Sequence, residues 1–358
     1  MKVNGNQSVK IIPLGGLEQI GMNITAFEYE DSIIVVDCGL AFPDEEMLGI
    51  DLVIPDITYL KENAAKVKGL MITHGHEDHI GAIPYALKEL NMPIYATKLT
   101  MGLIENKLKE HNLLRSTRRK VVKHGQSINL GCFRIEFIKT NHSISDAAAL
   151  AIYTPAGIIV HTGDFKIDYT PVFGDAIDLG RFAELGKKGV LALMCDSTNV
   201  EREGYTPSER TVGRTLNHLF DEHSDHRIIV ATFASNVDRV QQIINCACKY
   251  GKKVVVEGRS MVNTISTAAE LGYIKIPENT LIGIEEMRNY VDEQIVLITT
   301  GSQGETMAAL SRMAASTHRK VSIKPGDVII FSSHPIPGNE KAVSKVMNEL
   351  AKKGASVI

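Results

Sequence analysis

Residues 73–81 read THGHEDHIG, and this stretch decides how the rest of the chain is interpreted. Within six residues it holds four side chains that can bind a metal ion: His74, His76, Asp78 and His79. Zinc in proteins prefers imidazole nitrogens and carboxylate oxygens. One helix face would gather only some of the four, whereas a loop at a strand end can direct two toward one ion and two toward another. The alternative is a surface loop that is rich in histidine by chance, and the density of ligands argues against it.

Two polar residues farther along the chain also follow apolar strands. His142 comes two residues after the end of FRIEFIKT, and Asp164 ends the stretch GIIVHTGD. Taken singly, a histidine or aspartate at such a point is often a cap or a turn residue. Together with the histidine-rich stretch, they predict additional metal ligands, with the Asp164 carboxylate placed to bridge two ions.

Composition limits the class of protein. A chain of 358 residues, of which 44% are hydrophobic, predicts two domains with packed cores and excludes wholesale disorder. With a formal net charge of -3, binding to nucleic acid would need a local basic groove or specific phosphate contacts. Five cysteines without a C-x-x-C pair, each in or beside an apolar stretch, indicate buried reduced thiols. Without a signal-peptide h-region or a long apolar run, we expect a cytoplasmic protein that makes no contact with a membrane.

The pattern of strands and helices changes near residue 207. Residues 1–207 alternate short apolar strands with polar turns. From 208 onward, short apolar strands are each followed by a small-residue loop and a helix, which predicts a parallel α/β sheet. Ser208 is a candidate N-cap for the first of these helices. The chain stops where a further strand begins after the last helix, so we expect a fragment of a longer protein.

The combined motifs resemble the metallo-β-lactamase superfamily. The resemblance implies a four-layer αββα fold in residues 1–207. It implies two zinc ions, the first held by His74, His76 and His142 and the second by Asp78 and His79, with Asp164 between them. Asp37, in VVDCG, matches the first motif of the superfamily and would orient a ligand by hydrogen bonding; a simple turn residue is the alternative. Metal-bound hydroxide would be the nucleophile, and manganese is an alternative ion for the same ligands.

The second half narrows the resemblance to the β-CASP nucleases. CDSTNVEREG, with Asp196, is similar to motif A of that group, and residues 208–358 fit its inserted α/β domain, incomplete at the C-terminus. Longer stretches are similar to the bacterial ribonuclease J family: PLGGLEQIGMN, DCGLAFPDEEMLGIDLVIPD, THGHEDHIGAIPY, HTGDFKID, CDSTNVEREG, ATFASNVDR, TTGSQGE and PIPGNE. The resemblance implies a zinc-dependent endonuclease and 5′→3′ exonuclease that matures and degrades RNA, with catalytic roles for Asp78 and Asp196.

The resemblance also implies where substrate and a further ion bind. RNA carrying a 5′-monophosphate would pass along Phe233, Ala234, Ser235 and Asn236, where an aromatic ring can stack a base and polar side chains can contact phosphate or ribose. The alternative is that ATFASN is only a strand followed by an N-cap. A structural calcium ion is implied near Gly49 and Asp51, although LGID could equally form a turn.

Two further expectations concern what lies outside the chain. The H-x-S-G-H motif and a later zinc-binding histidine of the family do not occur before residue 358, so we expect the second zinc to bind weakly to these residues alone. In the whole protein we expect a homodimer or heteromer and association with RNA-decay proteins. The competing hypotheses are a non-catalytic scaffold subunit, which should have lost metal ligands, and a DNA-processing β-CASP nuclease.

Overall fold

A computed structural model of the chain describes residues 8–43, 47–336 and 338–358. The first seven residues, together with residues 44–46 and 337 of the motifs quoted above, lie outside the described part. The chain divides into two compact units, Met1–Pro207 and Ser208–Ile358, and each is treated separately below.

The first unit contains a six-stranded sheet that carries the histidine-rich stretch at its edge. Its strand order is β1-β2-β3-β4-β5-β6, antiparallel from β1 to β3 and parallel from β3 to β6. Because β3 and β4 run parallel, the residues that follow each strand emerge side by side at one edge. The strands are β1 (Lys10–Gly15), β2 (Ile24–Tyr29), β3 (Ser32–Val36), β4 (Val67–Met71), β5 (Ile94–Ala96) and β6 (Arg119–Val121).

A second, five-stranded sheet packs against the first. Its order is β11-β10-β9-β8-β7, antiparallel except where β10 and β11 run parallel. Alternate apolar side chains of both sheets form a shared core that includes Phe27, Ile34, Phe137 and Leu150. The strands are β7 (Ser127–Leu130), β8 (Phe133–Lys139), β9 (Ala148–Thr154), β10 (Gly157–His161) and β11 (Ala192–Met194).

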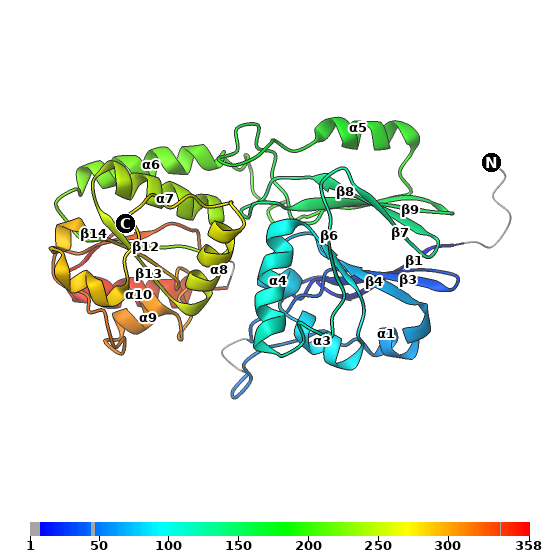
Figure 1. Cartoon of the computed structure of the whole chain (residues 1–358), viewed down its shortest axis with the longest axis horizontal. Helices are drawn as coiled ribbons and strands as arrows, with labels where there is room; N and C mark the ends of the chain where they lie inside the picture. The colour runs from blue at the N-terminus through cyan, green and yellow to red at the C-terminus, as the bar shows by residue number, and fades with distance from the viewer. Residues whose placement is uncertain (1–7, 44–46, 337) are drawn as a thin grey trace. The chain divides into compact units, whose positions relative to one another are not determined.

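Helices cover the outer faces of both sheets (Figure 1). Helix α5 (Leu179–Lys188) packs on the second sheet through Leu185 and Phe182. The first sheet is covered by α1 (Thr58–Glu62), the 3₁₀ turn η1 (Ala64–Lys66), α3 (Ile83–Glu89) and α4 (Lys98–Glu110). The layers are therefore helix, sheet, sheet and helix, which confirms the predicted αββα fold.

One local feature differs from the prediction of a histidine-rich loop. His74 and His76 lie on extended backbone after β4, but Asp78 and His79 belong to a one-turn helix, α2 (Glu77–Ile80). Three backbone hydrogen bonds explain the turn. The amides of Asn23, Cys38 and Leu40 donate to the carbonyls of Asp78, His79 and Glu77.

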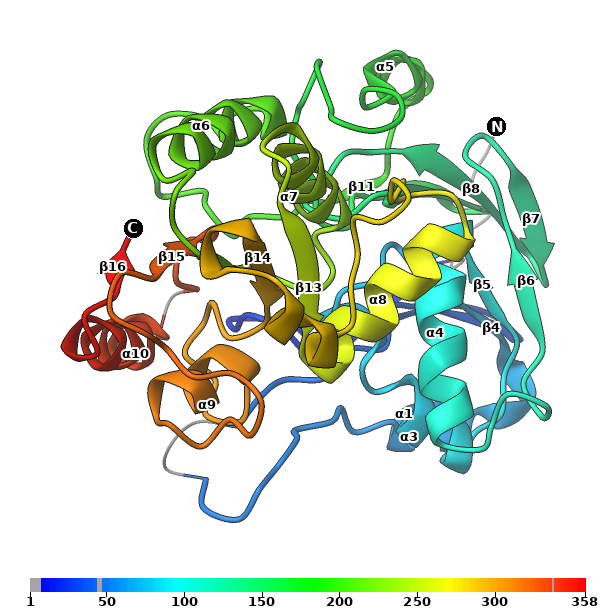
Figure 2. The same cartoon turned by 60° about the vertical axis from the view of Figure 1, so that its left-hand side comes forward.

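The second unit is the predicted parallel α/β sheet, in the order β13-β14-β12-β15-β16. Helices α6 and α7 lie on one face, and α9 and α10 lie on the other (Figures 1 and 2). Ser208 caps α6, as predicted. The elements are α6 (Glu209–Glu222), β12 (Ile228–Ala231), α7 (Val237–Lys249), β13 (Lys253–Glu257), α8 (Arg259–Glu270), η2 (Ile284–Asn289), η3 (Asp292–Gln294), β14 (Ile295–Thr299), α9 (Ala309–Ala314), β15 (Val328–Phe331), α10 (Glu340–Lys352) and β16 (Ser356–Val357).

Two predictions from composition concern membrane-spanning segments and the burial of the cysteine thiols. Among the described residues, no helix combines the length and the apolar character needed to cross a membrane. All five cysteines are free thiols, but Cys132 and Cys195 are exposed, so the prediction that every thiol is buried is wrong for these two. Cys195 follows directly on β11, a short edge strand whose side chains face solvent in part.

Candidate metal centre

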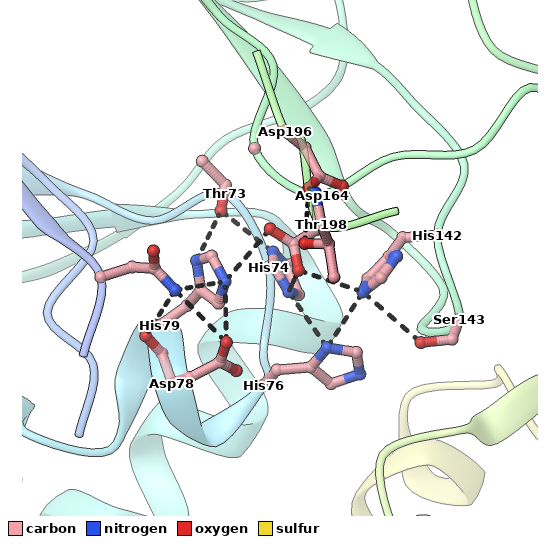
Figure 3. Close-up of polar contacts among 12 residues, drawn as sticks. Thr73, His74, His76, Asp78, His79, His142, Ser143, Asp164, Asp196 and Thr198 are labelled. Carbon is pink, nitrogen blue, oxygen red and sulfur yellow. Dashed lines mark hydrogen bonds and ion pairs between the residues drawn. The ribbon is translucent and has the colours of Figure 1, made fainter. Parts of the chain in front are cut away.

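Four of the predicted ligands come from three strand ends that one edge of the two-sheet core brings together: His74 and His76 follow β4, His142 follows β8, and Asp164 follows β10. Asp37, the predicted supporting residue, follows β3 at the same edge. Figure 3 shows the imidazole rings and carboxylates of this cluster pointing toward one another. The described residues contain two groups with ligand atoms within 4.8 Å of one another: His74, His76, His142 and Asp164, and Asp78, His79 and Asp164.

The first group is a cluster of three histidines. Nδ1 of His76 lies 3.1 Å from Nε2 of His74 and 3.1 Å from Nε2 of His142. Oδ2 of Asp164 lies 3.9 Å from Nε2 of His74 and 3.6 Å from Nε2 of His142. The four atoms converge on one point from three separate segments of chain.

The second group shares the Asp164 carboxylate through its other oxygen. Nε2 of His79 lies 3.4 Å from Oδ1 of Asp164 and 3.4 Å from Oδ2 of Asp78. One carboxylate therefore presents Oδ2 to the three-histidine cluster and Oδ1 to the second group. This is the arrangement in which a single aspartate can bridge two ions.

The spacing of the ligand atoms fits a bound cation. Around a tetrahedral ion with bonds of about 2.0 Å to nitrogen, ligand atoms lie about 3.3 Å apart. The separations in the first group, 3.1 to 3.9 Å, scatter around that value. The mixed nitrogen and carboxylate donors suit zinc and also suit other divalent ions of the first transition series.

The electrostatics of the first group also favour a cation. Burial, and then the neighbouring imidazoles, lower the pKa of His74 well below the ordinary histidine value. Burial and His142 lower the pKa of His76 to about 3, and burial lowers the pKa of His142. The three rings are therefore neutral at physiological pH and present lone pairs, which is the form that binds metals.

In the second group, negatively charged carboxylates outnumber the histidine. Burial acts to lower the pKa of His79, but Asp78, Asp37 and Asp164 raise it well above the ordinary value. Burial acts to raise the pKa of Asp164, but His79, His142 and His76 together outweigh burial and keep the pKa below its usual range. Excess negative charge surrounds His79, and a divalent cation would neutralise it once Nε2 gives up its proton.

Asp37 connects the two ends of the histidine-rich stretch, at Thr73 and at His79. Its Oδ2 accepts a hydrogen bond from Oγ1 of Thr73 at 2.8 Å and lies 2.8 Å from Nδ1 of His79. Its Oδ1 accepts from the backbone amide of Thr73 at 2.8 Å. Asp37 is buried and adopts a left-handed backbone conformation (φ 60°), which costs conformational energy in a residue other than glycine. These contacts fix the His79 ring so that Nε2 faces Asp78 and Asp164.

Asn23 and Thr73 contribute to the site in ways that sequence reasoning missed. Nδ2 of Asn23 lies 3.2 Å from the backbone carbonyl of Asp78, 3.3 Å from its Oδ2 and 3.1 Å from Nε2 of His79. Oγ1 of Thr73 also lies 3.0 Å from Nδ1 of His74. Both residues stand at an end of a quoted motif, PLGGLEQIGMN and THGHEDHIG, but only the folded structure shows what they contact.

Asp196 lies at the same edge but belongs to neither ligand group. Its backbone amide donates to Oγ1 of Thr162 at 3.0 Å, and it follows β11, the strand that pairs with the one leading to Asp164. Its Oδ1 accepts from the amide and the hydroxyl of Thr198, at 2.9 and 2.7 Å. Figure 3 shows Asp196 above Asp164. The catalytic role assigned to Asp196 stays a prediction.

The predicted RNA contacts lie in the second unit, on the loop between β12 and α7. Phe233, Ala234 and Ser235 are half-buried, whereas Asn236 is buried and caps α7, its Oδ1 accepting from the amide of Arg239 at 3.0 Å. The loop emerges at the carboxyl end of a parallel sheet, where open α/β folds bind ligands. Asn236 thus has the helix-capping role that was the alternative to substrate contact, and contact with RNA stays a prediction for all four.

Gly49 and Asp51, the predicted calcium residues, lie on an exposed segment next to residues outside the described part. Gly49 adopts a left-handed conformation (φ 80°), as expected of a turn. Neither residue is among the groups of candidate metal ligands in the described ranges.

Known proteins resemble the chain in sequence and in fold. Residues 21–200 match the family model of the metallo-β-lactamase superfamily, and residues 225–350 match that of the ribonuclease J β-CASP domain. Ribonuclease J from Helicobacter pylori is 50% identical over all of this chain and 52% of its own length; the Synechocystis protein is 48% identical over 98% and 55%. Ribonuclease J2 of Bacillus subtilis is 43% identical over the whole chain and 64% of its own length.

A solved structure extends the likeness to the fold. An Enterococcus faecalis protein of unknown function superposes with a TM-score of 0.67 over 99% of this chain and 87% of its own, at 17% sequence identity. The chain spans a little over half the length of the first two relatives.

The αββα unit and the family match together define the class: the chain belongs to the metallo-β-lactamase superfamily. Within that superfamily, its second unit is a β-CASP domain of the ribonuclease J type. The His/Asp clusters of the first unit are accordingly a candidate metal centre.

Proposed function

We propose that the protein is a metal-dependent ribonuclease that hydrolyses RNA phosphodiester bonds. The observation that carries the proposal is the shared Asp164 carboxylate, which faces the three-histidine cluster with one oxygen and the Asp78/His79 pair with the other. The names of the relatives, ribonuclease J, support RNA as the substrate.

In this proposal the two ligand groups have separate roles. His74, His76 and His142 would hold the first ion and Asp78 and His79 the second, and Asp164 would serve both. Two bound divalent ions supply an activated water near neutral pH and stabilise charge on the phosphoryl oxygens. Asp37 and Thr73 keep the rings of His79 and His74 oriented, and Asn23 donates to the Asp78 carboxylate. Because the ions would activate a water molecule as the nucleophile, hydrolysis needs no serine or cysteine nucleophile.

The finer points of the proposal concern metal, substrate and context. Zinc is the expected ion, with manganese as the alternative, and a calcium ion near Gly49 and Asp51 has a structural role. Phe233 stacks a nucleobase, and RNA with a 5′-monophosphate is degraded both internally and from its 5′ end. The whole protein works in the cytoplasm in RNA maturation and decay, as a homodimer or heteromer with RNA-decay proteins as partners.

End-labelled RNA bearing a 5′-monophosphate tests the proposal. We would compare this chain, a version extended to the length of its relatives, and the extended version carrying His76→Ala, each with zinc or manganese. We expect cleavage by the extended protein and its loss in His76→Ala, because Nδ1 of His76 lies between the other two histidines.

Two other outcomes identify the competing functions. Absence of cleavage by the extended protein with either metal would contradict the nuclease and favour a scaffold subunit. Preference for a DNA strand of the same sequence in direct competition would favour a DNA-processing nuclease. A 5′-hydroxyl RNA of the same sequence serves as the control for end recognition.

A further inference from the structure

Helix α4 begins without a cap from its own chain segment. The side chain of its N-cap residue, Thr97, caps no backbone amide of the helix and lies instead 3.2 Å from the hydroxyl of Thr100, and the first turn holds no acidic residue. Three or four amides at a helix N-terminus need acceptors from elsewhere, and a negative charge there is favourable. An acceptor for this helix therefore has to come from another part of the chain.

Asp146 supplies that acceptor from 47 positions away. Its Oδ2 accepts a hydrogen bond from the backbone amide of Leu99 at 3.1 Å, the second helical position, which a capping side chain usually contacts. The hydroxyl of Thr97 in turn donates to the backbone carbonyl of Asp146 at 2.8 Å. Asp146 adopts a left-handed conformation (φ 70°), which aspartate and asparagine tolerate better than most residues.

The segment that Asp146 ends is the one that carries His142. The amide of Thr140 donates to the carbonyl of Ala147 and closes the loop, and the amide of Ala148 donates to the carbonyl of Thr73 at 2.9 Å. His142 lies inside this loop. Attaching the loop to α4 through Asp146 thus limits where the imidazole of His142 can lie.

The same helix also packs closely against Gly75, which lies between the other two histidines of the cluster. A Cβ at Gly75, between His74 and His76, would lie 2.7 Å from Cδ1 of Leu103 in α4 and 3.2 Å from Cδ1 of Ile144 in the His142 loop. The first turns of α4 therefore contact both histidine-bearing segments. A shift of α4 would move the segments relative to each other.

We propose that Asp146 is a positioning residue of the metal centre: by capping α4 from the His142 loop, it holds His142 in register with His74 and His76. The proposal rests on the metal centre put forward above. Asp146 belongs to neither ligand cluster; its Oδ2 caps α4, and its Oδ1 lies 4.0 Å from Nδ1 of His124.

Three substitutions separate the contributions of Asp146. Asp146→Asn keeps a capping oxygen and tolerates the left-handed backbone. Asp146→Gly keeps the backbone conformation but removes the cap, and Asp146→Ala removes both. His142→Ala marks complete loss of one ligand. Ser208→Ala is the matched control, because Ser208 caps α6 in the second unit and has no part in the His142 loop.

Metal binding of the folded proteins is the readout. We would titrate each with cobalt(II), following the visible absorption that reports ligand geometry, and measure zinc affinity by competition with a chromophoric chelator. We expect Asp146→Gly and Asp146→Ala to lose roughly tenfold in affinity, the lower end of what supporting residues contribute. Their cobalt spectra should change in the same bands as that of His142→Ala, whereas Asp146→Asn and Ser208→Ala should resemble the wild type.

The alternatives have distinct signatures. Wild-type affinity and an unchanged spectrum in both Asp146→Gly and Asp146→Ala would overturn the proposal. Equal losses in Asp146→Asn would overturn the cap as the cause, and equal losses in Ser208→Ala would show general destabilisation instead. A wild-type protein that binds neither cobalt nor zinc would overturn the metal centre itself, and this inference with it.

Discussion

Oδ2 of Asp37 lies 2.8 Å from Nδ1 of His79, and both side chains are almost fully buried. The pair joins the end of β3 to helix α2, across 42 positions of sequence. Because the outer nitrogen of His79 faces Asp78 and Asp164, the inner contact to Asp37 decides which way the ring turns. The geometry of the second ion site thus depends on a residue that would not touch the ion.

Asp37→Asn should weaken that second site selectively. Both oxygens of Asp37 face hydrogen-bond donors of Thr73 or His79. The amide nitrogen of the asparagine would therefore face a donor, and at least one of these hydrogen bonds would be lost. We expect a loss of roughly 10- to 100-fold in affinity for the second ion, with the three-histidine cluster less affected. Stepwise metal titration measures both sites in one experiment; parallel weakening of the two would contradict the assignment.

Removal of individual ligands should reveal the sharing of Asp164. We expect His142→Ala to weaken only the first ion and Asp78→Ala only the second, whereas Asp164→Asn should weaken both, because its two oxygens face different groups. Metal content after dialysis, determined by elemental analysis, gives the count. If Asp164→Asn retained one ion at wild-type affinity, the bridging role would be wrong.

Gly39→Ala should disrupt the site through the backbone alone. A Cβ at Gly39 would lie 1.5 Å from the carbonyl oxygen of Asp78, a distance that forces α2 to move. We expect a destabilisation well beyond the ~1 kcal/mol typical of a point substitution, together with loss of the second ion. Gly186→Ala, on the exposed face of α5 with open space around it, is the control and should stabilise by about 0.5–1 kcal/mol. Chemical denaturation of both variants provides the comparison, and a Gly39→Ala protein as stable as the wild type would contradict the contact.

Glu28 should make the first unit sensitive to acid. Its buried carboxylate accepts from Lys66 at 2.7 Å, from Lys10 at 3.2 Å and from the hydroxyl of Tyr59. Chiefly through Lys66, these partners lower the pKa of Glu28 from 4.5 to about 2. A lowered carboxyl pKa stabilises the fold above the unfolded value, and this stabilisation is lost as pH falls from about 4.5 toward 2.

The matching measurement is the difference in unfolding free energy between the wild type and Glu28→Gln across this pH range. We expect the wild type to be more stable at pH 7 by on the order of 3 kcal/mol, from 1.36 kcal/mol per pKa unit. The difference should shrink as pH drops below about 4.5. A difference that stayed constant down to pH 3 would show that the Glu28 charge does not stabilise the fold.

Short-range patterns in the sequence were enough to predict much of this protein. Short apolar runs predicted most strands of both units, although not β6 and β7, and small-residue loops before helices predicted the parallel sheet from Ile228 to Val357. The spacing of His74, His76, Asp78 and His79 indicated metal chemistry. These inferences succeed because periodicity and ligand type are properties of neighbouring residues.

The tertiary structure alone decided which oxygen of Asp164 faces which cluster, how Asp37 turns His79, and that Asn23 lies against Asp78 and Asp146 against the start of α4. Each of these contacts joins segments that are far apart in the sequence, so its geometry depends on how the elements of the first unit pack. Backbone hydrogen bonds from Asn23, Cys38 and Leu40 also hold a helical turn where a loop was expected, and the absence of a side chain at Gly39 leaves room for it. Local propensity for so short a helix is weak, and long-range backbone hydrogen bonds determine it instead.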